Sequence, residues 1–431
     1  MMNLSVEQNQ VIKLVQKDKN VFMTGPGGTG KSYLIDFICS MYPTKKIQIC
    51  ALTGCAAELL TNASTIHRWA GTGLSNGDKQ DVIHRVIRKK QNIKKWKQID
   101  ILIIDEVSMM SLKYFETLDL LGKTIRSNGL PFGGIQLIFS GDFYQLPPVG
   151  NESEPDTCKF CFESPLWHQT FSHVVVLKHI FRQTDPVFSK ILRQIRRGGI
   201  TEKSHSILKK RIMNKDNKKD LSYGKELNPP LILPLKDAVK HINDMNMNKL
   251  DTPLQTYDYK IIYPINYNQI NKKVIEYEMN HLKKRMNAEL SLQLKKGAHV
   301  MCVANIDMEG SNKIVNGSQG VIENIIHDIP IVRFKNGVTK LMTHHSWMSE
   351  DIEGLGIQQI PLILSWAITI HKSQGITLDS AIIDAGNNIF ECGQIYVALS
   401  RLKSLQGLFL GEFNHHRIMT NPKVIEYYSS L

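Results

Sequence analysis

The sequence predicts an α/β fold built on a parallel sheet. An apolar strand at 21–23 is followed by a glycine-rich loop and then by a helix with an apolar face. Further apolar runs at 47–52, 99–109, 134–142 and 173–178 are separated by helical patterns. Such continuous apolar runs are typical of parallel strands covered on both faces. Polar residues follow the runs, at the strand ends where open α/β sheets bind their ligands.

The loop at 25–32 reads GPGGTGKS and matches the phosphate-binding pattern G-x-x-x-x-G-K-[ST]. Its glycines permit backbone angles that a side chain would block, so successive N–H groups can surround phosphate oxygens. Lys31 is expected to reach the β- and γ-phosphates, and Ser32 to bind Mg²⁺. The predicted nucleotide-binding residues of this loop are Gly25, Gly27, Gly28, Thr29, Gly30, Lys31 and Ser32.

A helix is predicted at 4–17, where Ser5 is the N-cap and Gln8 completes a capping box. This pattern already gives Gln8 a complete structural role. After the strand at 47–52, Thr53 lies at a carboxyl end, where ligand contacts are expected. His67 belongs to the cluster TIHRW, which fits a loop that packs a tryptophan into a core as well as it fits a nucleic-acid surface.

The stretch 80–98 is rich in Lys, Arg and His and predicts one helix with a short apolar stripe. We expect a solvated basic face, with direct DNA contact as the alternative.

The buried strand predicted at 99–109 places Asp105 and Glu106 at its end. In a nucleoside triphosphatase, Asp105 would hold Mg²⁺ and Glu106 would act as the general base for the attacking water.

Two further apolar runs add polar residues to the expected ligand edge. The strand at 134–142 leads to Asp142 and Gln145, which could sense the γ-phosphate. The run at 173–178 is followed by HIFRQ, which places Arg182 in a loop. An amphipathic helix at 187–199 then ends at two glycines.

A second α/β half is predicted after a lysine-rich approach. Its expected elements are strands at 231–235, 259–265, 381–385 and 408–411 and a long helix at 268–286. The stretch 292–365 alternates short strands and turns, which predicts a small antiparallel β-barrel inserted into this half. The domains expected are therefore 1–185, then 186–291 together with 366–431, and the insert 292–365.

Two segments of the second half carry candidate functional residues. The stretch 365–379 contains Thr369, His371 and Ser373, and a helix at 394–405 carries Arg401. Each could be an ordinary helix or loop with surface charge. Beside an ATP site, Arg401 could act as an arginine finger, worth roughly 10³ to 10⁵ in rate.

The whole chain is basic, with 53 Lys and Arg against 40 Asp and Glu, a net charge of +13 over 431 residues. This surplus favours a polyanionic partner, although a basic protein without one is the alternative. Seven cysteines, mostly within apolar runs, indicate reduced thiols in an intracellular protein. Because we find no signal peptide and no apolar stretch long enough to span a bilayer, we expect a soluble protein with no membrane partner.

Taken together, the motifs resemble the petite-integration-frequency (Pif) family of superfamily 1B DNA helicases, from Leu4 to Leu410. The resemblance rests on segments in family order: LSVEQ, GPGGTGKS, ALTGCAA, TIHRWAG, IDEVSM, PFGGIQLIFSGDFYQLPPV, FRQTDPVF, LKKGAHVM, VNGSQG, IHKSQGITLD and YVALSR. It implies two RecA-like parallel-sheet domains, with an SH3-like β-barrel insert in the second.

The resemblance also implies an activity and assigns the residues that carry it. The protein would use ATP and Mg²⁺ to move 5′ to 3′ on single-stranded DNA and unwind duplexes in replication, recombination or repair. Its partners would be single-stranded DNA, forked or tailed duplexes and replication proteins, and we expect a monomer. Gln8 would recognise adenine, and Ser32 and Asp105 would bind Mg²⁺. The implied catalytic residues are Lys31, Glu106, Gln145, Arg182 and Arg401, and the implied DNA contacts are Thr53, His67, Thr369, His371 and Ser373.

Departures from the family pattern are few. Cellular relatives usually carry long N-terminal extensions, whereas the adenine motif here begins at Leu4. No mitochondrial targeting segment precedes it, so an organellar role is not expected. Leu402 stands where the family more often has a small residue, which we expect to alter packing only. The near-minimal length suits a large DNA virus, a phage or a mobile element.

Two other functions stay open at this stage. One is a nucleic-acid-binding subunit without catalysis of its own, and the other is an RNA helicase or a remodeller of RNA–DNA hybrids from the same superfamily. A set of intact active-site residues argues against the first, namely Lys31, Asp105, Glu106, Arg182 and Arg401. Comparing ATP hydrolysis with DNA and RNA oligonucleotides would decide the second.

Overall fold

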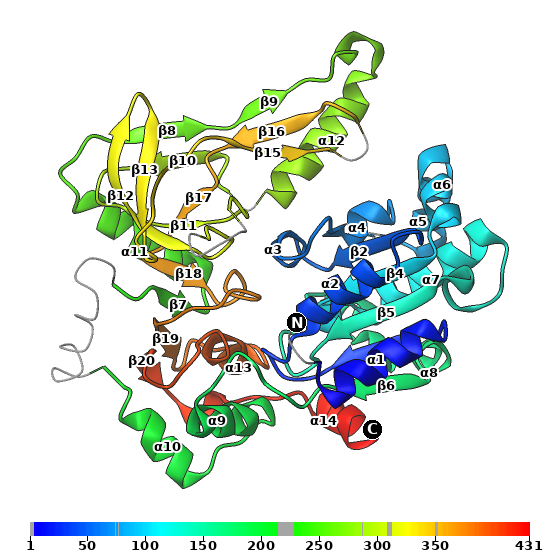
Figure 1. Cartoon of the computed structure of the whole chain (residues 1–431), viewed down its shortest axis with the longest axis horizontal. Helices are drawn as coiled ribbons and strands as arrows, with labels where there is room; N and C mark the ends of the chain where they lie inside the picture. Colours follow the sequence, from blue (N-terminus) through cyan, green and yellow to red (C-terminus); the bar gives the residue numbers. More distant parts are fainter. Residues whose placement is uncertain are drawn as a thin grey trace. The chain divides into compact units, whose positions relative to one another are not determined.

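The computed structural model describes residues 4–73, 75, 77–213, 228–286, 288–307, 313–349 and 352–431 (Figure 1). Contacts divide the described residues into two compact units. The first unit lies within Met1–Lys210, Ala385–Gly407 and Asn414–Leu431, and the second within Arg211–Asp384 and Leu408–Phe413. Because this division follows contacts alone, the domain limits expected from the sequence stay predictions. None of the described helices is long and apolar enough to span a membrane.

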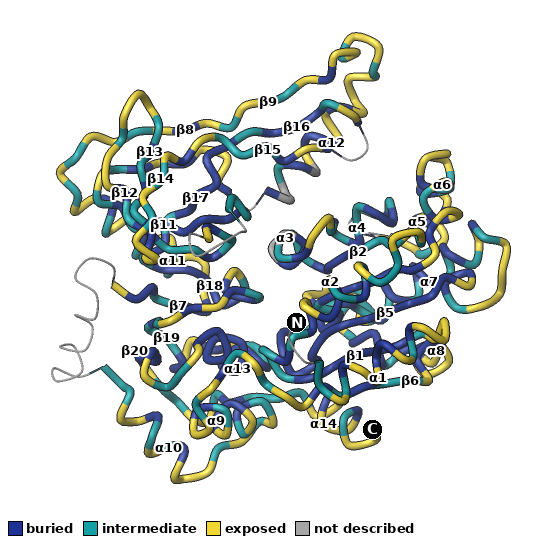
Figure 2. Tube along the Cα trace, viewed as in Figure 1, coloured by how far each residue is buried: buried dark blue, intermediate teal, exposed yellow. Residues whose placement is uncertain are grey.

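The first unit is organised around a six-stranded sheet in the order β3-β2-β4-β5-β1-β6. Its strands are β1 (Val21–Thr24), β2 (Ile47–Ala51), β3 (Ser64–Thr65), β4 (Ile101–Asp105), β5 (Gln136–Gly141) and β6 (His173–Val176). Every neighbouring pair is parallel. Strands β1, β4 and β5 are buried along their whole length, as Figure 2 shows in dark blue. The predicted parallel α/β fold is therefore confirmed.

The first unit also contains α-helices, some of which pack against this sheet. They are α1 (Val6–Gln16), α2 (Lys31–Met41), α3 (Gly54–Glu58), α4 (Ile66–Trp69), α5 (Lys79–Ile87), α6 (Lys90–Gln98), α7 (Leu112–Arg126), α8 (Pro165–Thr170), α9 (Pro186–Arg196), α10 (Glu202–Lys209), α13 (Gln394–Leu399) and α14 (Pro422–Ser429). Buried side chains of α1 and α2 share one core with β1, β2, β4 and β5. The predicted capping box at the start of α1 is present, with both hydrogen bonds formed between Ser5 and Gln8.

The prediction of one helix at 80–98 is wrong, because the chain breaks between α5 and α6. Lys89 has extended backbone angles (φ −96°, ψ 108°). The side chain of Asn92 turns back and donates to the carbonyl of Val86 (3.3 Å), near the end of α5. Trp96 is fully buried, and its indole N–H donates to the carbonyl of Ala70 (3.3 Å). Each short helix buries apolar residues, namely Val82, Ile83 and Val86 in α5 and Trp96 in α6.

The second unit contains a four-stranded sheet in the order β18-β7-β19-β20. Its strands are β7 (Leu231–Leu233), β18 (Ala367–Thr369), β19 (Ala381–Ala385) and β20 (Leu408–Phe413). Strand β7 pairs in parallel with β18 and β19. Helix α11 (Lys236–Asn248) is fastened to β18 because the amide of Asn243 bonds both the N–H and the carbonyl of Ala367. The strands predicted at 231–235, 381–385 and 408–411 are therefore confirmed.

The strand predicted at 259–265 is present, but its assignment to the parallel sheet is wrong. It forms β9 (Lys260–Ile262), which pairs antiparallel with β16 (Gly356–Gln359). No residue of β9 is fully buried. A parallel strand needs cover on both faces, which explains why β9 lies in an antiparallel sheet. The long helix predicted at 268–286 is α12 (Lys272–Arg285) and follows a turn at Tyr267–Gln269.

The stretch predicted as an antiparallel insert does form antiparallel strands. Five of them, in the order β14-β13-β12-β11-β17, are β11 (His299–Cys302), β12 (Gln319–Ile326), β13 (Ile329–Phe334), β14 (Thr339–Leu341) and β17 (Leu362–Leu364). Two smaller sheets pair β10 (Ser291–Leu294) with β8 (Gln255–Asp258), and β15 (His345–Met348) with β16. Burial alternates along β10 and β13, as expected for strands with one buried face. The comparison of this insert with an SH3-like barrel stays a prediction.

Candidate functional site

The glycine-rich loop lies between β1 and α2, at the carboxyl edge of the parallel sheet (Figure 1). Gly28 and Gly30 have φ angles of 84° and 77°, in the left-handed region that favours glycine. A Cβ atom on Gly28 would lie 2.5 Å from the Cβ of Arg182, too close for any side chain. The loop therefore has the backbone that a phosphate-binding loop needs, and Arg182 lies directly beside it.

Lys31 begins α2, and its side chain is buried within the loop. Its Nζ donates to the carbonyls of Gly25 (2.8 Å) and Pro26 (3.1 Å). Burial lowers the pKa of Lys31, and the carboxylates of Asp142 and Glu106 act in the opposite direction. A phosphate within reach would favour the charged amine further. The geometry therefore fits the predicted phosphate contact.

The end of β4 places oxygen ligands beside the start of α2. The Ser32 hydroxyl lies 3.5 Å from Oδ2 of Asp105, and Oδ1 of Asp105 accepts the N–H of Glu106 (2.9 Å). Glu106 has left-handed backbone angles (φ 54°, ψ 41°), which are uncommon outside glycine. A hydroxyl and a carboxylate are oxygen donors of the kind that Mg²⁺ prefers. Ser32 and Asp105 thus fit the predicted metal site.

Residues after β6 bond the turn that follows α13 (Gln394–Leu399). The amide of Gln183 donates to the carbonyls of Ser400 (3.1 Å) and Leu402 (2.8 Å), and Arg182 donates to the carbonyl of Ser400 (3.2 Å). After Leu399 the backbone bonds no longer follow the α-helical pattern, since the N–H of Arg401 donates to the carbonyl of Ala398 (3.3 Å) and the N–H of Leu402 to that of Leu399 (3.1 Å). The helix predicted at 394–405 is therefore wrong beyond Leu399, and Arg401 lies in the turn that follows it.

Arg401 is only 2 % exposed and lies in the same compact unit as the phosphate loop. Its guanidinium donates to the carbonyl of Val397 (2.9 Å) and to the hydroxyl of Ser400 (2.8 Å). A Cβ atom on Gly27 would lie 3.7 Å from Nη2 of Arg401. Burial, and then the charge of Arg182, lower the pKa of Arg401 to about 9. Two cations with lowered pKa values beside a glycine loop, Arg401 buried and Arg182 half-buried, are suited to a phosphate group.

Gln8 contacts the loop at Thr29 and is 2 % exposed. Its Oε1 accepts the N–H of Ser5 (2.9 Å), and its Nε2 donates to the carbonyl of Thr29 (3.4 Å). A pocket of about 570 Å³ lies beside it, lined by Ser5, Val6, Glu7, Lys178, His179 and Phe181. Phe181 lines this pocket, and the sequence analysis did not identify it as a candidate site residue. The sequence feature that could have indicated a role for Phe181 is its position directly before Arg182.

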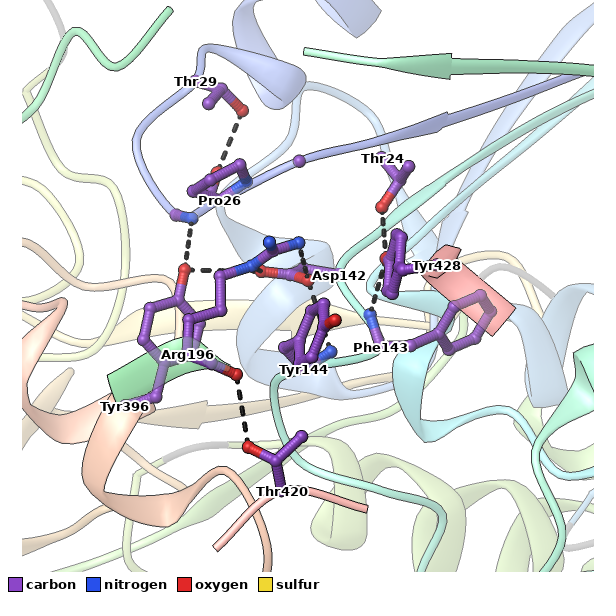
Figure 3. Close-up of polar contacts among 12 residues, drawn as sticks. Thr24, Pro26, Thr29, Asp142, Phe143, Tyr144, Arg196, Tyr396, Thr420 and Tyr428 are labelled. Carbon is purple, nitrogen blue, oxygen red and sulfur yellow. Dashed lines mark hydrogen bonds and ion pairs between the residues drawn. The ribbon is translucent and has the colours of Figure 1, made fainter. Parts of the chain in front are cut away.

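Asp142 is fully buried at the end of β5, and its carboxylate accepts hydrogen bonds from several donors (Figure 3). Arg196 of α9 donates from Nε to Oδ2 (2.9 Å) and from Nη2 to Oδ1 (2.8 Å). The hydroxyl of Tyr396 lies 3.3 Å from Oδ2 and 2.9 Å from the N–H of Gly27. Sequence reasoning missed Arg196 and Tyr396, because the first belonged to an amphipathic helix and the second to a motif considered only for its arginine.

Gln145 is 4 % exposed, and its N–H donates to the carbonyl of Asp142 (2.8 Å). Its side-chain oxygen is buried and has no hydrogen-bond partner within the described part of the chain. Buried polar atoms are usually satisfied, so this oxygen is available to a bound group or to water. The predicted role of Gln145 in sensing the γ-phosphate stays a prediction.

The first unit holds two of the predicted DNA contacts. Thr53 caps α3, since its hydroxyl accepts the N–H of Ala56 (3.2 Å). The ring of His67 stacks on Tyr114, with the centroids 4.4 Å apart and the planes at 8°. Burial lowers the pKa of His67 to about 4, so the ring is neutral at physiological pH. Both side chains have structural roles, and their contact with DNA stays a prediction.

The other three predicted DNA contacts lie in the second unit, Thr369 at the end of β18 and His371 and Ser373 in the turn that follows. The hydroxyl of Thr369 accepts the N–H of Lys372 (3.1 Å). Ser373 is fully buried, and its hydroxyl donates to the carbonyl of Ile370 (2.7 Å). His371 is partly buried. These hydroxyls maintain the turn, and DNA binding by this turn stays a prediction.

Known proteins of one family are similar to this chain. Residues 3–206 match the family model for PIF1-like helicase, and 278–325 match the model for the 2B domain of DNA helicase Pif1. The chain is 35 % identical to the ATP-dependent DNA helicase PIF1 of Xenopus laevis, over 99 % of this chain and 64 % of that protein. It is 31 % identical to uncharacterized protein 030L of Invertebrate iridescent virus 6, over 99 % of this chain and 94 % of that protein.

Solved structures agree over the whole length. The crystal structure of the Pif1 helicase from Candida albicans is 32 % identical, with a TM-score of 0.81 and full coverage of both chains. The Pif1 helicase from Bacteroides in complex with ADP-AlF3 and single-stranded DNA is 28 % identical, with a TM-score of 0.70 over 100 % of this chain and 97 % of that one. This chain spans 64 % of the length of the Xenopus relative.

Proposed function

The chain belongs to the PIF1-like helicase family, and from this membership we propose that it is an ATP-dependent DNA helicase that moves 5′ to 3′ on single-stranded DNA and separates duplexes in replication, recombination or repair. One observation carries the proposal: the residues expected to bind and hydrolyse ATP all belong to the compact unit that contains the glycine loop. They are Gln8, Lys31, Ser32, Asp105, Glu106, Gln145, Arg182 and Arg401.

The proposed chemistry follows from these positions. Lys31, Arg182 and Arg401 provide positive charge where the transferred phosphoryl group becomes more negative. Glu106 follows the buried strand β4 and is the group available to orient and deprotonate the attacking water. Ser32 and Asp105 would hold Mg²⁺, which supplies further charge neutralisation at the phosphate oxygens.

DNA binding is proposed for residues of both units. Thr53 and His67 belong to the first unit, and Thr369, His371 and Ser373 belong to the second. If the two units alternate their grip on the DNA backbone during each ATP cycle, the protein advances along the strand. The Bacteroides relative determined with single-stranded DNA supports this choice of partner. Opening a duplex must offset about 1.4 kcal/mol of stacking per base-pair step, so ATP hydrolysis has to be coupled to strand separation.

Steady-state ATP hydrolysis with matched oligonucleotides tests the proposal. We expect hydrolysis in the presence of Mg²⁺ to rise steeply when single-stranded DNA is added, and to respond weakly to RNA of the same sequence. Stimulation by RNA alone would indicate an RNA helicase. No hydrolysis with either oligonucleotide would indicate a binding subunit without catalysis and would contradict the proposal.

A further inference from the structure

The hydroxyl of Tyr396 lies between the phosphate loop and Asp142 (Figure 3). Its side chain is only 3 % exposed. Burial, and then the Asp142 carboxylate, raise the pKa of Tyr396, so the group keeps its proton. A protonated phenol can donate one hydrogen bond and accept others. Tyr396 can therefore bond an acceptor and a donor at the same time.

The partners of Asp142 fix the direction of these bonds. Its Oδ2 accepts from Nε of Arg196, and its Oδ1 accepts from Nη2 of Arg196 and from the N–H of Tyr144 (3.2 Å). An ionised carboxylate is an acceptor only. Tyr396 must therefore donate to Asp142, which leaves its lone pairs for the N–H of Gly27. Both bonds of the hydroxyl are thus determined, and the side chain cannot change its χ1 rotamer without losing them.

Tyr396 also belongs to the helical turn that holds Arg401. The carbonyl of Tyr396 accepts the N–H of Ser400 (2.9 Å). The carbonyl of the next residue, Val397, accepts Nε of Arg401 (2.9 Å). Gly27, which donates to Tyr396, also lies close to the guanidinium of Arg401, because a Cβ there would lie 3.7 Å from Nη2. One hydroxyl therefore connects the phosphate loop to the turn that carries the arginine.

From this geometry we propose that Tyr396 is a positioning residue for Arg401 in ATP hydrolysis. Its hydroxyl fixes the turn that carries Arg401 against Gly27 of the phosphate loop. The inference rests on the proposed ATPase function and assigns a residue that acts through Arg401 without touching the reacting atoms. Small displacements of a catalytic group can lower a rate severely, so losing one such bond should slow the chemical step.

The first test replaces Tyr396 with phenylalanine, which keeps the ring and removes only the hydroxyl. We expect kcat for DNA-stimulated hydrolysis to fall about tenfold while KM and ADP affinity change little, because the interaction matters mainly in the transition state. The matched control is Tyr427→Phe. Tyr427 is also buried in the first unit, but its hydroxyl accepts from the indole of Trp167 (3.0 Å). The control should keep the kcat of the unaltered chain.

The second test is a double-mutant cycle with Arg401→Ala, measured by single-turnover hydrolysis. If Tyr396 acts through Arg401, Tyr396→Phe should change the rate of the Arg401→Ala chain by less than about twofold. Multiplying losses would overturn the inference, as would a change confined to KM. A Tyr396→Phe chain that melts below the assay temperature would also overturn it, because the hydroxyl would then maintain the fold. An unaltered chain without ATPase activity would instead refute the proposed function.

Discussion

Replacing Arg196 with methionine should destabilise the first unit, because it leaves the Asp142 carboxylate buried without its cation. The Asp142 side chain is 0 % exposed and that of Arg196 is 11 % exposed. Burial lowers the pKa of Arg196, but the Asp142 carboxylate raises it by more, so the guanidinium stays charged. Removing one partner of a buried ion pair typically costs about 3–5 kcal/mol.

The surroundings of Arg196 place the expected loss near the lower end of that range. Tyr396 and the N–H of Tyr144 still donate to Asp142 after the substitution. The loss of cation–π contacts increases the destabilisation. The guanidinium lies 4.2 Å from the ring centroid of Tyr144 and 5.3 Å from that of Tyr428, and the substitution removes both contacts. We therefore expect a loss of about 3 kcal/mol, or roughly 6–12 °C in Tm for a unit of this size.

Calorimetric melting of the full chain measures this loss. Arg193→Met is the matched control, because Arg193 lies on the same helix, is exposed, and makes one long bond from Nε to the carbonyl of Ser189 (3.4 Å). The control should change stability by less than about 0.5 kcal/mol. Adding Asp142→Asn to Arg196→Met should recover part of the loss, since a neutral amide is less costly to bury than an unpaired carboxylate.

Two results would refute this reasoning. A loss below about 1 kcal/mol in Arg196→Met would mean that the pair is screened like a surface ion pair. A further loss when Asp142→Asn is added would mean that the unpaired carboxylate was not the source of the instability.

The remaining predictions concern three residues of the same unit. Lys31→Ala should abolish ATP hydrolysis and leave binding to single-stranded DNA intact, because it removes a phosphate contact; normal hydrolysis would contradict the nucleotide site. Arg401→Ala should lower kcat by roughly 10³-fold or more with a much smaller change in KM, and a change in KM alone would make Arg401 a binding residue. The pKa of His67 is about 4 in the folded chain, below its ordinary value of 6.5. Unfolding therefore takes up a proton, and the stability held above pH 6.5 is lost as the pH falls from about 6.5 to 4. His67→Phe, which keeps a ring on Tyr114, should melt with a weaker dependence on pH in this window, and an unchanged dependence would contradict the burial of a neutral imidazole.

The sequence predicted those parts of the site that depend on local pattern. The phosphate loop and the capping box at Ser5 are short motifs whose geometry follows from neighbouring residues, so both were confirmed. The parallel sheet was predicted from continuous apolar runs, because a strand that is buried on both faces consists mostly of apolar residues. Arg182 received a role only through the family resemblance, and Arg401 first through its expected place beside an ATP site, since an arginine in a loop has no periodicity that marks it.

Contacts between distant residues could not be predicted in this way. Tyr396 and Gly27 are separated by 369 positions, and no periodicity relates them. The turn after α13 is bonded by the side chain of Gln183, which lies more than two hundred residues earlier in the chain. Similarly, the strand at 259–265 was recognised, but its partner β16 lies about a hundred residues later. Local propensity favours an element, whereas the tertiary contacts decide its length and its neighbours.

The central claim is tested most directly by strand separation on two partial duplexes that differ only in the polarity of their single-stranded tail. With ATP and Mg²⁺, we expect the full chain to open the duplex with a 5′ tail and to leave the duplex with a 3′ tail closed. Opening only the 3′-tailed duplex would contradict the proposed polarity. If neither duplex opens although DNA stimulates ATP hydrolysis, the protein is a translocase without unwinding activity, and the proposed helicase function is wrong.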